Sequence, residues 1–468
     1  MAVHVIQDYT RRSVQLPNVP GLPEPYATDL EQVITVFQSK LKRNILRSRY
    51  YDSKNSLKDL GISIPPPIAN NSEFQAVVGW AEKAVSELQQ RSRYDGFVGE
   101  GSDLANSIFD DNSFAKKYPM LTTSELTHSV AFASVTRGRR RPVQISLYSA
   151  CNAAAIWDFE NDCVRVGLTI TSVDKLNNPT GYNLFTSDAV VALHKPDKDK
   201  NIWNFEILPH NMGKPLFVSF ANQPSLDRPF GRSRISRAVM SATDEAVREL
   251  VRISIGSEFA VAPQKWIMGA SDDLLDEIPE WQAYIGNILA ISRDENGDLP
   301  TVGQFAQVDM QQHVQLMKLS ASRMSGASDV PIHLLGVTAD SNPTSAEAIL
   351  ASTNALVIKA QTLNVTNGDA LTELARMAVA VYNNTSLDAL TSEELDITPK
   401  FLSPLYLTPL TQADAITKMV AAIPWIAESE VILEQFGFEK SDIQRLMSDK
   451  RKMNAMSAIN ALNARSSE

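Results

Sequence analysis

The sequence predicts an α+β fold in which an antiparallel sheet is flanked by long helices. Apolar and polar residues alternate in four stretches between residues 143 and 220, the period of strands with one buried face. The remaining sequence shows helical periodicity instead, in segments 29–51, 76–91, 231–258, 310–325, 345–382 and 411–468. Strands grouped between runs of helices are typical of the α+β class.

Composition sets limits on what the protein does. The chain has 468 residues, 44% of them hydrophobic, which is enough for about three domain-sized pieces. Its net charge of −10 predicts that any contact with nucleic acid is local or weak. Cys151 and Cys163 lack a CxxC spacing and a neighbouring histidine, and we interpret them as reduced. We expect no signal peptide, no membrane contact and synthesis in a cytoplasm, because no apolar run approaches about 20 residues.

The N-terminal region divides into an arm and two helices. Four prolines between positions 17 and 25 predict an extended arm that does not pack. The first helix carries apolar residues at helical spacing: Leu30, Val33, Ile34, Phe37, Leu41 and Ile45. The second places Val77, Trp80, Ala84 and Leu88 on one face. The strands that follow are predicted around residues 143–147, 164–170, 203–207 and 216–220, with a turn at 174–181 and one face exposed to solvent.

Two helices enclose an insert of about 50 residues, an arrangement that predicts a stalk with the insert at its tip. The insert (263–309) is predicted to hold a strand at Gln264–Met268, a helix at 281–290 and a tight turn at Asn296-Gly297. The first helix has an arginine stripe, which consists of Arg234, Arg237, Arg248 and Arg252. The second has an apolar seam, which consists of Met310, Val314, Met317, Ala321 and Met324.

An isolated stalk would leave both features exposed, so we predict that neighbouring copies in a ring cover them. The seam would pack between copies, and most of the arginines would pair with carboxylates of a neighbour, Glu245 sharing their face. The alternative for the arginines is a solvated helix face. A polar loop (326–345) and a long helix to Tyr382 follow, with a kink predicted at Asn364–Gly368.

A search for catalytic motifs returns nothing. The chain has no G-x-x-x-x-G-K-[ST] and no G-x-S-x-G, and Gly99-Glu100-Gly101 lacks the third glycine of a dinucleotide loop. Its six histidines have no metal-binding spacing. We therefore expect no enzyme activity, no metal site and no cofactor. One acidic cluster lies in the insert, either as a docking surface for a basic partner or as a solvated tip: Asp272, Asp273, Asp276, Glu277 and Glu280.

Several segments together resemble the portal proteins of tailed bacteriophages, of the siphophage type. RPFGRSRISRAVMSATDEAVRELVRISIGSEFAVAPQKWIMGA (228–270) looks like their stem helix and clip entry. RYYDSKNSLKDLGISIPP (49–66) and VVGWAEKAVSEL (77–88) resemble their N-terminal helix pair, and LLGVTADSNPTSAEAILASTNAL (334–356) resembles their tunnel loop. The resemblance implies a wing (1–230), stem helices (231–258 and 310–327), a clip (259–309), a tunnel loop (328–345), a kinked helix with a wing return (346–409) and a short crown (410–468).

The resemblance also implies a function. A dodecameric ring would form in the host cytoplasm and sit at one vertex of the virion capsid, where double-stranded DNA passes through it during packaging and ejection. Expected partners are the terminase large subunit, a head–tail adaptor or head-completion protein, and the major capsid and scaffolding proteins. Candidate DNA-channel residues are Lys318, Arg323, Asn342, Thr344 and Ser345. Two alternatives stay open: a soluble multidomain enzyme with an unrecognised motif, and another structural protein of the virion, such as an adaptor or a shell protein.

Overall fold

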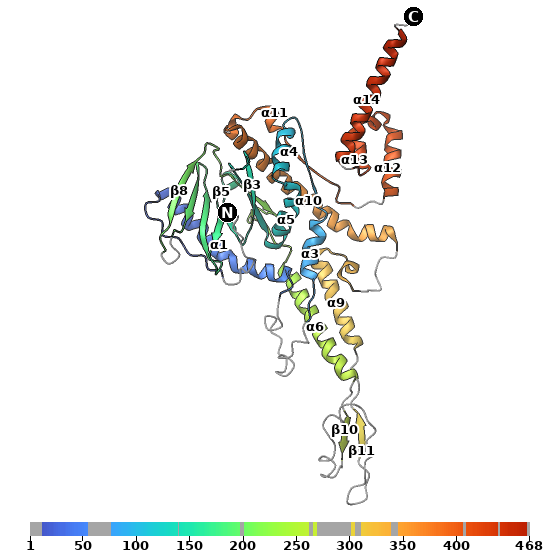
Figure 1. Ribbon diagram of the computed structural model, residues 1–468. Helices are drawn as coiled ribbons and strands as arrows, with labels where there is room; N and C mark the ends of the chain where they lie inside the picture. Colours follow the sequence, from blue (N-terminus) through green and yellow to red (C-terminus); the bar gives the residue numbers. More distant parts are fainter. Residues whose placement is uncertain are drawn as a thin grey trace, which may run out of the picture. The chain divides into compact units, whose positions relative to one another are not determined.

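Figure 1 shows the computed structural model, which describes residues 12–54, 76–138, 140–196, 201–261, 265–268, 301–304, 310–337, 345–405, 409–438 and 440–465. The chain divides into two compact units, Met1–Pro404 and Leu405–Glu468. The first contains the antiparallel sheets and most of the long helices, and the predicted α+β class is confirmed.

Two antiparallel sheets form the centre of the first unit. The larger has five strands in sequence order: β4 (Ala153–Asp158), β5 (Cys163–Val173), β6 (Pro179–Phe185), β7 (Ala189–His194) and β8 (Asn204–Pro209). The smaller has the order β3 (Gln144–Ser149), β2 (Val130–Thr136), β9 (Phe217–Ala221). The predicted strands correspond to β3, β5, β8 and β9, and the predicted turn at 174–181 joins β5 to β6.

The prediction of one solvent-exposed sheet face is wrong for the central strands, because the two sheets pack on each other. The Phe217 ring stacks on Phe132 and on Phe185, with both pairs of ring centroids 5.1 Å apart. A Cβ atom at Gly167 of β5 would lie 2.3 Å from the Phe217 ring, so this close approach requires glycine. The opposite face of the five-stranded sheet packs on helix α1 (Glu24–Tyr51).

Helix α1 confirms the predicted apolar stripe, because Leu30, Val33, Ile34, Phe37 and Leu41 are all buried. The N-terminal arm differs from the prediction in its described part. Val14 is buried in the same cluster as α1, and the Arg12 guanidinium donates a 2.7 Å hydrogen bond to the carbonyl oxygen of Cys151. Residues 12–22 therefore pack against the sheet instead of forming a free arm.

A second layer of helices covers the smaller sheet. Its members are α4 (Ser102–Asp111), α5 (Phe114–His128) and α10 (Ala346–Asn383), beside the strand pair β1 (Tyr94–Val98) and β12 (Thr398–Phe401). Helix α10 begins where predicted, because the Ser345 hydroxyl accepts a hydrogen bond from the Ala348 amide. The helix continues across residues 364–368, and the kink that the sequence predicts there stays a prediction.

The predicted stalk consists of α6 (Arg237–Val261) and α9 (Gln311–Ser328), which lie side by side (Figure 1). Beyond them, β10 (Lys265–Met268) pairs with β11 (Thr301–Gln304), in agreement with the strand predicted at 264–268. The helix and the turn predicted at 281–297 lie outside the described residues. Helix α3 (Trp80–Gln89) and a short 3-10 helix, η2 (Ile332–Leu335), pack near the base of the stalk.

The second unit is helical, as the sequence predicts for residues 411–468. It contains α12 (Pro409–Ala422), α13 (Glu430–Gln435) and α14 (Lys440–Arg465). The basic residues Lys450, Arg451 and Lys452 lie on α14.

Candidate functional site

The candidate site is the stalk together with its junction to the sheets, because the predicted assembly and channel residues gather there. Small residues let the two stalk helices approach closely: Ala242 and Ala246 of α6 and Ala321 of α9 are all fully buried. Met310 lies against Gly256 of α6. The buried apolar face of α9 therefore packs on α6 of the same chain.

This packing corrects the prediction for the apolar seam. Ala321 and Met324 have no exposed surface, and Met317 packs on the same buried cluster. The prediction that Ala321 and Met324 contact a neighbouring copy is wrong, because α6 covers them. Val314 is exposed over 42% of its surface, and Met310 and Met317 are half-buried, so for these three the inter-subunit role stays a prediction.

Charged residues also pair along the stalk within one chain. Glu245 of α6 forms an ion pair with Arg323 of α9. Glu249 is buried, accepts a 2.5 Å hydrogen bond from Arg252, and lies 3.1 Å from Nδ1 of His313. The carboxylate that pairs with Arg252 thus belongs to its own helix, whereas the sequence predicted a carboxylate of a neighbour.

Arg234 is a buried connection at the base of the stalk. Its Nε donates a 3.0 Å hydrogen bond to the carbonyl oxygen of Ala84 in α3, and its Nη2 donates to the carbonyl oxygen of Ser328 at the end of α9. Asp329 lies 3.8 Å from Nη1 and also pairs with Lys359 of α10. Burial lowers the pKa of Arg234 to about 10, which leaves it charged at neutral pH.

The prediction of an inter-subunit role for Arg234 is therefore wrong. A side chain that is 7% exposed and bonded to α3, α9 and Asp329 has no surface left for a second copy. Of the other stripe residues, Arg237 is exposed, and Arg248 is half-buried beside Asp244. For these two, the inter-subunit role stays a prediction.

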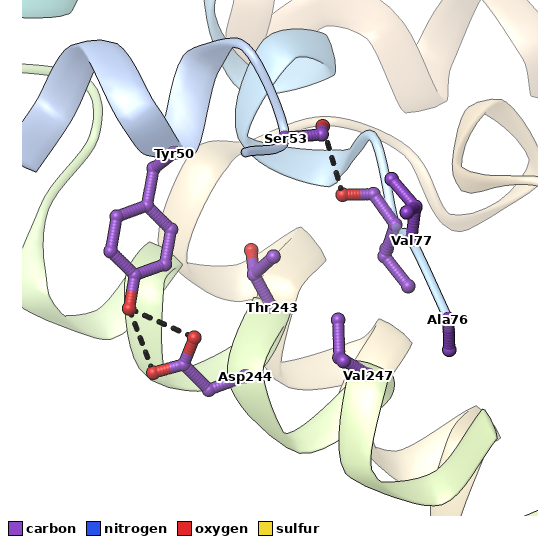
Figure 2. Close-up of a pocket in the computed structure, with 8 residues that line it drawn as sticks. Tyr50, Ser53, Ala76, Val77, Thr243, Asp244 and Val247 are labelled. Atoms are coloured by element: carbon purple, nitrogen blue, oxygen red, sulfur yellow. Dashed lines mark hydrogen bonds between the residues drawn. The ribbon is translucent and has the colours of Figure 1, made fainter. Parts of the chain in front are cut away.

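Figure 2 shows the place where α1, the segment before α3, and α6 meet. The Tyr50 hydroxyl lies 2.8 Å from each carboxylate oxygen of Asp244, to which it donates, and Ser53 donates to the carbonyl oxygen of Val78. Burial raises the pKa of Asp244. The cavity between these residues has a volume of about 20 Å³, room for a single water molecule, so it is a structural joint and not a small-molecule site.

Apolar side chains remain exposed on α9 and on the first half of α10. On α9, Leu316 and Leu319 are 42% and 57% exposed. On the first half of α10, Ile349, Leu350 and Ile358 are 44%, 40% and 55% exposed. Sequence reasoning missed all five; on α9 it followed the seam, whose Ala321 and Met324 are buried. The face of α9 opposite that stripe would have drawn attention to Leu316 and Leu319.

The predicted channel residues are only partly described. Lys318 is half-buried on α9, Arg323 is paired with Glu245, and the Ser345 hydroxyl is used as the cap of α10. Asn342 and Thr344 lie outside the described residues, as does the acidic cluster Asp272, Asp273, Asp276, Glu277 and Glu280. Their roles stay predictions.

One buried trio has the residue types of a nucleophilic site. Nε2 of His128 lies 2.8 Å from Oγ of Ser48 and 3.6 Å from Sγ of Cys151. Burial lowers the pKa of His128 to about 4 and raises that of Cys151 to about 11. A neutral thiol in a buried core is a poor nucleophile. The polar contacts of the trio therefore connect α1 to α5 structurally.

The described residues contain no group of three His, Cys, Asp or Glu side chains arranged to hold a metal ion. Within them, no helix combines the length and the apolar character that a membrane span needs.

Solved structures to which the chain is similar come from gene transfer agent (GTA) particles. One is the neck of a native GTA particle computed with C12 symmetry, with a TM-score of 0.44 and 13% identity, covering 78% of this chain and 89% of that chain. Another is the virion of a native GTA particle, with a TM-score of 0.45 and 13% identity, covering 85% of this chain and 93% of that chain.

Sequence comparison extends over nearly the whole chain. It is 23% identical over 422 residues to the portal protein of Mycobacterium phage L5, covering 86% of this chain and 84% of that protein. It is 21% identical over 461 residues to the portal protein of Mycobacterium phage D29, covering 92% of this chain and 90% of that protein. The family model described as "Phage portal protein, SPP1 Gp6-like" matches residues 30–453. The chain therefore belongs to the phage portal protein family, whose members are structural components of the virion.

Proposed function

We propose that twelve copies of this chain form a ring at a unique capsid vertex and that double-stranded DNA passes through the ring during packaging and ejection. Membership of the portal family supports this proposal. The observation that carries it is the exposed apolar surface on α9 and on the first half of α10, including Leu319 and Ile358, each more than half exposed.

A ring accounts for this surface better than an isolated chain does. Exposed apolar side chains that lie close together mark surfaces that another molecule covers. Two different helices carry them, so one copy can offer α9 where the next offers α10. Contacts between unlike surfaces close into a ring when the rotation between copies is right.

The charges of the described stalk support a channel in which DNA slides. Strong neutralisation of phosphates would hold DNA in place, because each neutralised phosphate adds to the salt-sensitive affinity. Arg323 is already paired with Glu245, and within the described residues Lys318 forms no ion pair. A chain with a net charge of −10 and few unpaired cations on α9 would bind passing DNA weakly.

The docking partners belong to the same proposal. The terminase large subunit and then a head–tail adaptor would bind at the clip, where the acidic cluster at 272–280 would steer a basic surface. The major capsid and scaffolding proteins would contact the outside of the ring. No catalytic role is proposed.

The mass of the purified full-length protein tests the ring. We expect particles of about 620 kDa, twelve times the 51.5 kDa of one chain, with a central hole in negative-stain images. A monomer or a dimer at all concentrations would contradict the proposal and favour the alternative of an unrecognised enzyme. A ring that excludes DNA from its centre would keep the assembly and overturn the channel.

A further inference from the structure

The hairpin that joins β2 to β3 carries the densest group of positive charge in an otherwise acidic chain. Its loop reads Arg-Gly-Arg-Arg-Arg over residues 137–141. Arg137, Arg140 and Arg141 are described and exposed. None of these three forms an ion pair with any carboxylate in the parts of the chain that the structure describes, Asp110 and Asp111 at the end of nearby α4 included. Their charge is available to a partner.

The hairpin presents these arginines from a fixed base. The buried amide of Asn112 donates a 3.1 Å hydrogen bond to the carbonyl oxygen of Val143 and accepts a 2.9 Å bond from the Ile145 amide. Lys117 donates a 3.1 Å bond to the carbonyl oxygen of Ile145. These bonds hold the start of β3 against α4 and α5, so little ordering of the base is needed when a ligand binds.

The loop turns tightly at Gly138, and the charge of Arg141 acts on Lys117 of α5. A Cβ atom at Gly138 would lie 2.7 Å from the carbonyl oxygen of Arg141, so the turn requires glycine at this position. The charge of Arg141 adds to the effect of burial in lowering the pKa of Lys117. Cations that repel one another in this way gain from a partner with closely spaced negative charges.

We propose that this hairpin, with Arg137, Arg140 and Arg141, binds the phosphate backbone of double-stranded DNA. Duplex DNA carries one negative charge per about 1.7 Å of its axis, dense enough for adjacent arginines each to reach a phosphate. The guanidinium fork suits phosphate oxygens. Residues 137–141 contain no aromatic side chain on which a base could stack, so the contact is independent of sequence and does not favour single strands.

A carboxylate-rich protein surface is the competing partner. An exposed ion pair between two proteins contributes little to the free energy of binding. The carboxylates of a protein surface would also have to be spaced closely enough to pair with all three arginines. The DNA proposal rests on the proposed function only for the presence of DNA at the ring. Its test measures binding separately from ring formation, so the two can fail independently.

The test compares the full-length protein with Arg137→Gln/Arg140→Gln/Arg141→Gln and with a control of equal charge loss on α1, Lys40→Gln/Lys42→Gln/Arg43→Gln. The control residues are exposed. Binding of a mixed-sequence duplex of about 30 base pairs is measured by fluorescence anisotropy over a range of salt concentrations. Particle mass is recorded for every variant.

We expect the hairpin variant to assemble as the parent does and to bind DNA more weakly. The slope of log affinity against log salt should become shallower by about 2.7, that is about 0.9 for each lost phosphate contact. Between about 50 and 200 mM salt, the advantage of the parent should then shrink by about 40-fold. The control should keep the slope of the parent, and Arg→Lys at the same three positions should restore most of it.

Two results would overturn the inference. If the hairpin variant and the control change the slope of log affinity against log salt equally, the loss reflects net charge alone, and the hairpin is not a DNA-binding site. If the hairpin variant binds DNA normally but loses the ring, the arginines contact carboxylates of another copy.

Discussion

The two halves of helix α10 differ in where their apolar surface is covered. In the second half, Leu371, Leu374, Ala375 and Ala378 are fully buried among β2, β9 and α4. In the first half, Ile349 and Leu350 near its start keep 44% and 40% of their surface exposed, although Leu356, Ala360 and Leu363 further along are buried. Both halves are rich in apolar residues. Apolar content thus predicts that a helix needs a partner, but not whether its own chain supplies one.

Polar side chains mark the boundary between the halves. Asn364 accepts a 2.7 Å hydrogen bond from Ser92, and the Asn367 amide lies 3.0 Å from one oxygen of Glu125. Among the described residues, the other Glu125 oxygen and the Asn367 side-chain oxygen have no hydrogen-bond partner, although both are buried. Burial raises the pKa of Glu125 to about 8, and the proton it keeps supplies a donor to this group of acceptors.

The largest expected effect comes from truncating the buried half. Leu374→Ala leaves a cavity in the main core and should lower the free energy of unfolding by about 2–5 kcal/mol. The matched change Leu350→Ala in the exposed half should cost less than about 1 kcal/mol when assembly is prevented by dilution. Denaturant titration measures both. Equal losses of unfolding free energy in the two variants would mean that Leu350 is as well packed as Leu374.

Negative charges placed at the exposed start of α10 should prevent ring assembly without affecting the folding of the monomer. Ile349→Asp/Leu350→Asp places two carboxylates on the surface proposed to face a neighbour, so ring particles should disappear while the monomer keeps its melting temperature. The control Gln361→Asp adds a charge at an exposed polar position of the same helix and should still form rings. Particle mass decides the outcome, and normal rings from the double variant would remove this surface from the interface.

The boundary should respond to pH through Glu125. Its folded-state pKa of about 8 exceeds the ordinary value of 4.5, so the folded state holds the extra proton between these values. Stability from this group is fully present below pH 4.5 and is lost as pH rises towards 8. His128 acts in the opposite sense, since its pKa is lowered to about 4 and its contribution is lost as pH falls from 6.5 to 4.

Glu125→Gln should therefore flatten the decline of stability between pH 6.5 and 8, because glutamine stays neutral and keeps the donor. Melting temperatures across this range measure the effect. Glu347→Gln, at an exposed position in the first half of α10, should leave the profile unchanged. An unaltered decline in Glu125→Gln would assign it to another group.

The smallest effect is expected from the exposed stalk pair of Glu245 and Arg323. Their side chains are 34% and 50% exposed, so a double-mutant cycle with Glu245→Gln and Arg323→Gln should give a coupling of about 0–1 kcal/mol. Arg234→Gln should cost more than either, because it removes the donor to the buried carbonyl oxygens of Ala84 and Ser328.

The sequence by itself determined the long periodic elements and the family. Helices α1, α6, α9 and α10 and strands β3, β5, β8 and β9 follow from apolar spacing, because each buries one regular stripe or alternates along one face. The stripe of α1 was predicted residue by residue. Strands β2 and β6 are buried on both faces and were missed, because a strand covered on both faces shows little alternation. Helices α4 and α5 were also missed.

Only the tertiary structure decided what covers each face. Spacing places Met317, Ala321 and Met324 on one side of α9, but it does not reveal that α6 of the same chain packs there. Arg234 lies on the same sequence stripe as Arg237, yet one is buried at a junction of three helices and the other is exposed. Helical periodicity is a local property of neighbouring residues, whereas burial depends on segments such as Ala84 and Ser328, which contact Arg234 from far along the chain.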